Sequence, residues 1–165
     1  MFPPIPEWDA LHPLVVHFPI GLLMSAPVLI LLGAVVPKAG RYFRFAALVI
    51  MLLGATAAWV AVSTGEAAST LTDQSPPVGP VLDKHEELAE YSAWAFSILT
   101  GVYAVIAIVP ALLKKPVKGW ITTAVSIVFL CVYLGFTTLL AHTAHKGGLL
   151  VHEYGVHAFL PLGEE

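Results

Sequence analysis

Charge is scarce in this sequence. Only 12% of the 165 residues are Asp, Glu, Lys or Arg, whereas 58% are hydrophobic, and the mean hydropathy is +0.83. A soluble domain carries roughly twice that share of charged residues, and it could not bury so much apolar surface. The chain is therefore expected to lie in lipid, and its length indicates a single membrane domain over residues 1–165. The net charge of -3 argues against nucleic acid as a partner.

Cysteine is almost absent as well. Cys131 is the only one, and it lies within an apolar run. This excludes an internal disulfide, a CxxC redox pair and the CxxCH motif that attaches haem covalently. Any haem in this chain would be held by side-chain ligation alone. The segment HEELAE at 85–90 also lacks the second histidine of the HExxH motif, so it predicts no metalloprotease activity.

Lysine and arginine are missing from the interior of the long apolar runs. About 20 apolar residues span a bilayer as a helix, and four runs reach that length: residues 12–36, 43–65, 88–113 and 119–145. Short connections between such helices favour antiparallel neighbours. The sequence therefore predicts an all-α integral membrane protein, an antiparallel four-helix transmembrane bundle with the first and third helices lying diagonally. No internal repeat is evident.

Small residues mark the second run. Glycine or alanine recurs at close to four-residue spacing along it, at Gly54, Ala57, Ala58, Ala61 and Gly65. Such a stripe lets a neighbouring backbone approach closely. We expect this helix to pack inside the bundle.

Basic residues predict the orientation, because short loops rich in them stay in the cytoplasm. Six of the eight basic residues lie beside the first and third connections: Lys38, Arg41, Arg44, Lys114, Lys115 and Lys118. Residues 66–87 between the middle helices are mainly acidic, and so are both tails. Both termini are therefore expected on the extracytoplasmic face of a bacterial cytoplasmic (inner) membrane, which the chain crosses several times.

Histidines gather at the extracytoplasmic end of this predicted topology. All seven lie there: His12, His17, His85, His142, His145, His152 and His157. They come from three of the four helices and from the segment after the last. Four-helix bundles build cofactor sites from inward side chains of facing helices, so a shared site is a reasonable hypothesis. His157, near the C-terminus, is interpreted as a surface residue.

Two of these histidines stand on the diagonal helices. His17 lies in VVHFPIG, more than one turn inside the first span, where an ionisable residue is a functional candidate by default. Gly21, four residues on, leaves room beside it, and Pro19 favours a kink there. His85 is in a helix start rich in acidic residues, which is also ordinary capping. The structural alternative for both is a histidine that hydrogen-bonds a neighbouring helix or lies at the interface.

The C-terminal segment has the densest group. His142 and His145 are three residues apart and so share one face of the fourth helix. The pair Gly147-Gly148 is predicted to end that helix. Residues 147–160 then form a short return segment on the outer face, too short to span the membrane, which would carry His152 back over the pocket.

Two segments resemble the signatures of a bacterial membrane family catalogued as domain of unknown function 2231. These are HPLVVHFPIGL at 12–22 and HKGGLLVHEYGV at 145–156, and the resemblance covers almost the whole chain. Members often occur fused to, or beside, Rieske-type iron–sulfur or c-type cytochrome domains, which implies electron transfer. The positions carried over are His12, His17, His85, His145 and His152. Some relatives have histidine just before the terminal Gly-Val, where this chain has Tyr154, so a ligand there would be absent.

These expectations combine into a b-type haem subunit with bis-histidine ligation near the extracytoplasmic face. Six-coordinate iron with two imidazoles suits electron transfer rather than oxygen chemistry. The predicted iron ligands are His17 with His85, and His145 with His152 as a second or alternative pair; His12 and His142 are further cofactor-binding candidates. One non-covalent haem b is expected and two are allowed. Glu86, Glu90 or Glu153 would accept the second ring N–H of a ligand.

Such a protein would be an electron-transfer subunit rather than a stand-alone enzyme. Besides membrane lipid, its expected partners are an extracytoplasmic redox protein of the cytochrome c or Rieske type, or a quinol, within an oligomer or larger complex. The alternative is a structural or assembly subunit whose histidines bind Zn²⁺ or Cu²⁺, or only pack, because nitrogen ligands suit these metals too. A transporter would need polar residues at mid-membrane and interrupted helices in matching halves, and the sequence shows neither.

Overall fold

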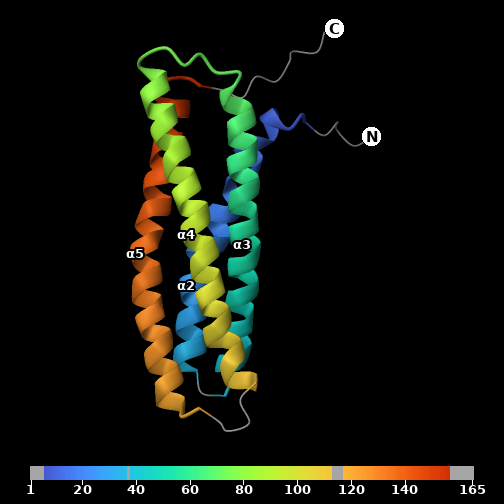
Figure 1. Ribbon diagram of the computed structural model, residues 1–165, viewed down its shortest axis with the longest axis vertical. Helices are drawn as coiled ribbons and strands as arrows, with labels where there is room; N and C mark the ends of the chain where they lie inside the picture. Colours follow the sequence, from blue (N-terminus) through green and yellow to red (C-terminus); the bar gives the residue numbers. More distant parts are fainter. Residues whose placement is uncertain (1–5, 37, 113–116, 157–165) are drawn as a thin grey trace.

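The computed structural model describes residues 6–36, 38–112 and 117–156, and within these ranges the fold is entirely helical (Figure 1). The elements in chain order are η1 (Asp9–Leu11), α1 (His12–Val15), α2 (His17–Val35), α3 (Gly40–Ser69), α4 (Val78–Leu112) and α5 (Gly119–His152). Four helical stretches are long and apolar enough to cross a membrane, namely Asp9–Val35, Gly40–Ser69, Val78–Pro110 and Gly119–His152. The four apolar runs of the sequence are thus confirmed as four long helices.

The four long helices pack side by side as a bundle. α2 and α4 each pack against both α3 and α5, so α2 and α4 occupy opposite corners. The connection from α3 to α4 lies at the upper end in Figure 1, together with η1 and the end of α5. Large side chains fill the core between the helices: Leu23, Ile30, Met51, Phe96, Tyr103 and Tyr133 are fully buried.

The outer surface of the bundle is apolar. Side chains such as Val28, Ile98 and Val128 are more than half exposed. Exposure of these apolar faces to water would be unfavourable in free energy, whereas the hydrocarbon core of a bilayer solvates apolar side chains. This surface fits a helical bundle embedded in lipid.

Prolines shape the first span. The helical ladder is interrupted at Val16, between α1 and α2 and three residues before Pro19. Pro27 lies inside α2, where its missing N–H leaves the carbonyl of Leu23 without a helical donor. The hydroxyl of Tyr133 on α5 donates to that carbonyl at 2.9 Å. The carbonyl that Pro27 leaves without a donor in α2 is therefore used for a hydrogen bond between α2 and α5.

The helices are longer than the apolar runs that predicted them. α3 and α4 begin at Gly40 and Val78, rather than at 43 and 88, because a helix can continue beyond the membrane through polar residues whose backbone bonds remain within the helix. His85 therefore lies two turns inside α4 and does not open it.

The prediction that Gly147-Gly148 ends the last helix is wrong. α5 continues through both glycines to His152, and the chain turns only at Gly155, whose φ is 67°. Glycine inside a helix costs about 1 kcal/mol relative to alanine, a cost that packing can offset. The described part of the predicted return segment is therefore helix up to 152, followed by a short turn; residues 157–160 lie outside the described ranges.

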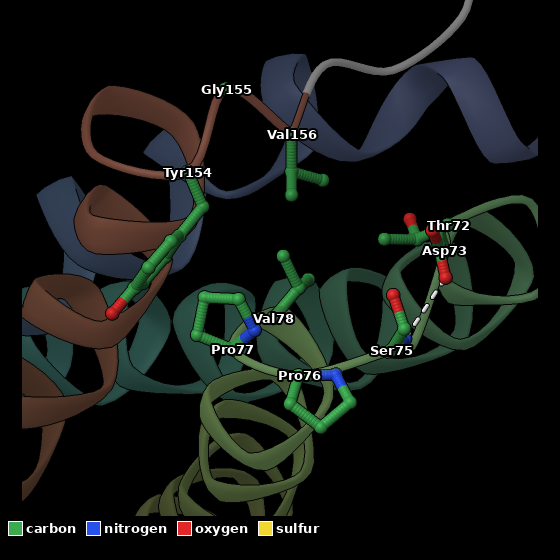
Figure 2. Close-up of a pocket in the computed structure, with 9 residues that line it drawn as sticks. All are labelled: Thr72, Asp73, Ser75, Pro76, Pro77, Val78, Tyr154, Gly155 and Val156. Atoms are coloured by element: carbon green, nitrogen blue, oxygen red, sulfur yellow. Dashed lines mark hydrogen bonds between the residues drawn. The ribbon is translucent and has the colours of Figure 1, made fainter.

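That turn lies beside the connection from α3 to α4. A cavity of about 370 Å³ separates them, lined by residues 72, 73, 75–78 and 154–156 (Figure 2). Within the connection, the backbone N–H of Ser75 donates to Asp73 Oδ1 at 2.9 Å. This hydrogen bond lowers the pKa of the exposed Asp73 carboxyl. The upper end of the bundle is thus bordered by a polar, proline-containing loop.

Candidate functional site

The imidazoles of His12 and His85 meet at the upper end of the bundle. Their ring centres lie 6.4 Å apart, and the ring planes are inclined by 80°. His12 begins α1 and His85 lies in α4, so the two rings come from the first and third spans. The predicted convergence of histidines from separate helices is therefore present for this pair.

His12 is fixed by α3. Its Nδ1 lies 3.0 Å from the carbonyl oxygen of Ala61 and 3.2 Å from the hydroxyl of Thr64. Because a carbonyl oxygen can only accept, Nδ1 carries the proton and Nε2 keeps its lone pair. The ring also lies against Gly65, where an added Cβ would come within 2.9 Å of Cε1. Only glycine at that position leaves the ring its space.

His85 is fixed by α5 in the same way. Its Nδ1 donates to the carbonyl oxygen of Thr143 at 3.0 Å, which again leaves Nε2 unprotonated. A Cβ added to Gly147 would lie 3.0 Å from Cε1 of the ring. The Thr143 hydroxyl also bonds to the hydroxyl of Ser92 at 3.0 Å, joining α5 to α4 directly below the imidazole.

The two histidines occupy equivalent places in two helical hairpins. In each hairpin, a histidine near the outer end of the first span donates to a carbonyl of the second span. In each, a glycine four residues after that carbonyl lies against the ring: Ala61 precedes Gly65, and Thr143 precedes Gly147. No internal repeat was visible in the sequence, because the shared feature is two backbone carbonyls and two glycines rather than a run of similar residues.

A cavity of about 490 Å³ surrounds the pair. It is lined by residues from all four spans, including four histidines, His12, His17, His85 and His152, and four carboxylates, Asp9, Glu66, Glu86 and Glu90. One oxygen of Glu86, Oε1, is buried there with no hydrogen-bond partner among the described residues. The cavity thus combines apolar walls with two part-buried imidazoles and the buried carboxylate oxygen of Glu86.

The other predicted histidines are placed differently. His17 lines the cavity but is exposed, so it lies at the cavity rim. The two rings that lie close together are those of His12 and His85, not those of His17 and His85. His152 is likewise exposed and at the rim. His142 and His145 are exposed and do not line this cavity. His157 lies outside the described residues.

The partners of the two buried rings are backbone carbonyls, where the sequence predicted carboxylates. Glu86 and Glu90 line the cavity, and Glu153 is exposed just beyond α5, but the Nδ1 atoms bond to Ala61 and Thr143. The small-residue stripe that includes Ala61 was the available signal for one of these partners. Small residues also recur at four-residue spacing around Thr143, as Thr143 with Gly147 and Ala144 with Gly148, so a similar signal was present there.

The arrangement suits a centre that needs two protein ligands. Over residues 6–36, 38–112 and 117–156, no group of three or more His, Cys, Asp or Glu side chains is placed to hold a metal ion. His12 and His85 are therefore the side chains that could act together on a group bound in this cavity.

Comparison with known protein families gives one match. The model of a family described as "predicted membrane protein (DUF2231)" matches residues 8–159. The chain belongs to this family. The match confirms the resemblance seen in the two sequence signatures and supports a multi-pass membrane protein, whereas the DUF2231 description names no cofactor or activity. No curated protein and no solved structure matches the chain.

Proposed function

We propose that this DUF2231 protein is a membrane-anchored electron-transfer subunit in which His12 and His85 ligate one b-type haem. The observation that carries the proposal is the pair of neighbouring imidazoles, whose ring centres lie 6.4 Å apart in an edge-on arrangement, each with Nδ1 bonded to a helix carbonyl. When bound, such a haem supplies one-electron transfer with no open coordination position. The chain would hold each ring in the ligating tautomer beside a cavity lined by apolar, imidazole and carboxylate side chains.

The tautomer is the main contribution of the second helix in each hairpin. A ligating histidine usually donates its other ring N–H to a carboxylate, carbonyl or water, and this partner fixes the orientation of the ring. Ala61 and Thr143 supply carbonyls in those roles. Both rings are thereby oriented before any ligand arrives, which reduces the entropic cost of binding.

The charge distribution supports an antiparallel bundle with the site near the extracytoplasmic face. Nine acidic residues fall in the described ranges, and all belong to the site end: Glu7, Asp9, Glu66, Asp73, Asp83, Glu86, Glu87, Glu90 and Glu153. The basic connections belong to the opposite end, which the positive-inside rule assigns to the cytoplasm. Both termini then lie outside a bacterial inner membrane, where a redox protein of the cytochrome c or Rieske type can approach.

A single haem is favoured over two. His145 and His152 were the predicted second pair, but His145 does not line the cavity that His152 borders. We therefore assign neither of them, nor His17, as an iron ligand in this proposal.

A second candidate function has one observation in its favour. Each imidazole already hydrogen-bonds a neighbouring helix and packs on a glycine, as a purely structural histidine would. A structural or assembly subunit would need nothing more. A zinc site is less well supported, because structural zinc takes four protein ligands and catalytic zinc three.

Absorption spectroscopy separates these functions. Protein purified from cells with ample haem is expected to show a reduced-minus-oxidised spectrum of the b type. His12→Ala and His85→Ala are expected to lose it, while His142→Ala and His145→Ala, at exposed positions off the cavity, keep it. A colourless wild-type protein would overturn the haem proposal, and metal analysis of that preparation would then distinguish ion binding from packing.

A further inference from the structure

We infer that the electron donor to this site is a lipid-soluble quinol, which enters the cavity sideways between α2 and α5 and hydrogen-bonds to His17. The inference rests on the proposed haem function and adds the class of substrate. It follows from the shape of the cavity rim, from the side chains on each part of that rim and from the position of His17 relative to the buried ring pair.

The cavity reaches the lipid-facing surface between α2 and α5. His17 on α2 and Ala144 on α5 both line the cavity and are both exposed, so they belong to its rim. Ala144 follows Tyr133 by 11 residues, about three helical turns, and thus shares the helix face that bonds to α2 through Tyr133. α1 packs against α3, and η1 also lies toward α3 in Figure 1. The exposed positions of His17 and Ala144 are thus the observation that favours an entrance between α2 and α5.

The side chains of this part of the rim suit an amphipathic ring compound. Near His17 and Ala144 the lining is apolar, with Val16 just before α2, Ile20 on α2 and Leu140 on α5. The rim on α3 and α4 carries Glu66 and Glu90, which would repel an apolar tail. A quinol head group placed at His17 can donate a hydroxyl hydrogen to the imidazole while its isoprenoid tail stays in lipid.

His17 also lies at a suitable depth. It follows His12 by five residues, which is about 7.5 Å along a helix axis, toward the bundle centre. A head group there would lie in the same cavity as His12 and His85. Each quinol oxidised to quinone releases two electrons and two protons. His12 and His85 would hold a haem that supplies one-electron transfer to an acceptor protein outside, and His17 would take up the protons and release them to the outer water.

Binding provides the first test, and it does not need haem. Oxidised short-chain ubiquinone is titrated calorimetrically into the detergent-purified full chain. We expect His17→Ala to weaken binding about tenfold, as for the loss of one hydrogen bond, and Ala144→Phe to abolish it by filling the entrance. His145→Ala and Ala141→Phe, at exposed positions off the cavity, serve as controls. Equal binding by all five proteins would show simple partition into the micelle and would overturn the inference.

Reduction kinetics provide the second test. Stopped-flow mixing of haem-loaded protein with decyl-ubiquinol should reduce the haem, and His17→Ala should slow this about tenfold or more while dithionite still reduces it fully. A wild-type haem that dithionite reduces and quinol does not would overturn the quinol inference and leave the haem proposal standing. A protein without haem that still binds quinone through His17 would overturn the haem and keep the quinone site.

Discussion

At the scale of single residues, the two glycines beside the imidazoles matter as much as the histidines. Gly65 and Gly147 each leave room for a ring that a methyl group would displace. Glycine elsewhere in these helices can lack such a neighbour: a Cβ at Gly148 would meet nothing within 4 Å. Two adjacent glycines in one helix therefore have different roles, and substitution can separate them.

We expect Gly147→Ala to weaken haem binding by roughly tenfold or more, because overpacking of this kind costs about 1–3 kcal/mol. Gly148→Ala should leave haem binding unchanged and stabilise the helix by up to about 1 kcal/mol. The rate of haem transfer to an excess of apomyoglobin measures haem retention by both variants. Equal haem retention by the two variants would mean that the His85 ring does not depend on this space.

The residue scale is also where sequence reasoning was least precise. The motif HPLVVHFP contains His12 and His17, five residues apart and so separated by about 140° around a helix. Only one of them can face a given partner. The first span is apolar on all sides, so the sequence does not determine which of its faces turns toward the bundle centre. In the structure the ring that lies beside His85 is that of His12.

At the scale of helices, Pro27 and Tyr133 form a compensating pair across α2 and α5. Proline removes the donor for the Leu23 carbonyl, and the tyrosine hydroxyl replaces it. Since no water reaches the core of a membrane bundle, an unpaired carbonyl there is costly. The two residues should therefore be energetically coupled.

Tyr133→Phe is expected to lower the free energy of unfolding by about 0.5–2 kcal/mol. In a Pro27→Ala background the same change should cost less, because the introduced alanine would return a helical N–H to the Leu23 carbonyl. Unfolding in mixed micelles with increasing dodecyl sulfate measures all four proteins of this cycle, and Tyr91→Phe at an exposed position is the control. Purely additive effects would contradict the coupling.

Helix existence could be predicted from the sequence, and helix ends could not. Long apolar runs can be satisfied in lipid only as helices, so all four spans were foreseeable. The continuation of α5 through Gly147-Gly148 could not be foreseen. The two glycines locally favour a helix end, whereas Gly147 packs against His85, which lies 62 residues away in sequence. Contacts of this kind are invisible until the helices are placed together.

At the scale of the whole molecule, charge is segregated between the two ends. This predicts that the α3–α4 connection faces outward and the α4–α5 connection faces the cytoplasm. In a Cys131→Ser background, Ser75→Cys should be labelled by a membrane-impermeant maleimide in intact cells. Lys118→Cys should be labelled only after permeabilisation. The opposite pattern would invert the topology and place the cavity on the cytoplasmic side.

The division of the site between two hairpins has a consequence for biogenesis. If haem binds as proposed, neither half of the chain can retain it by itself, because each hairpin supplies one imidazole. Insertion of haem would join the halves at the end where the cavity separates them, and so would report that both had been inserted and docked correctly. A cell starved of haem would then accumulate a protein whose halves are less firmly joined at the site end, and proteases would degrade it faster than the haem-loaded form.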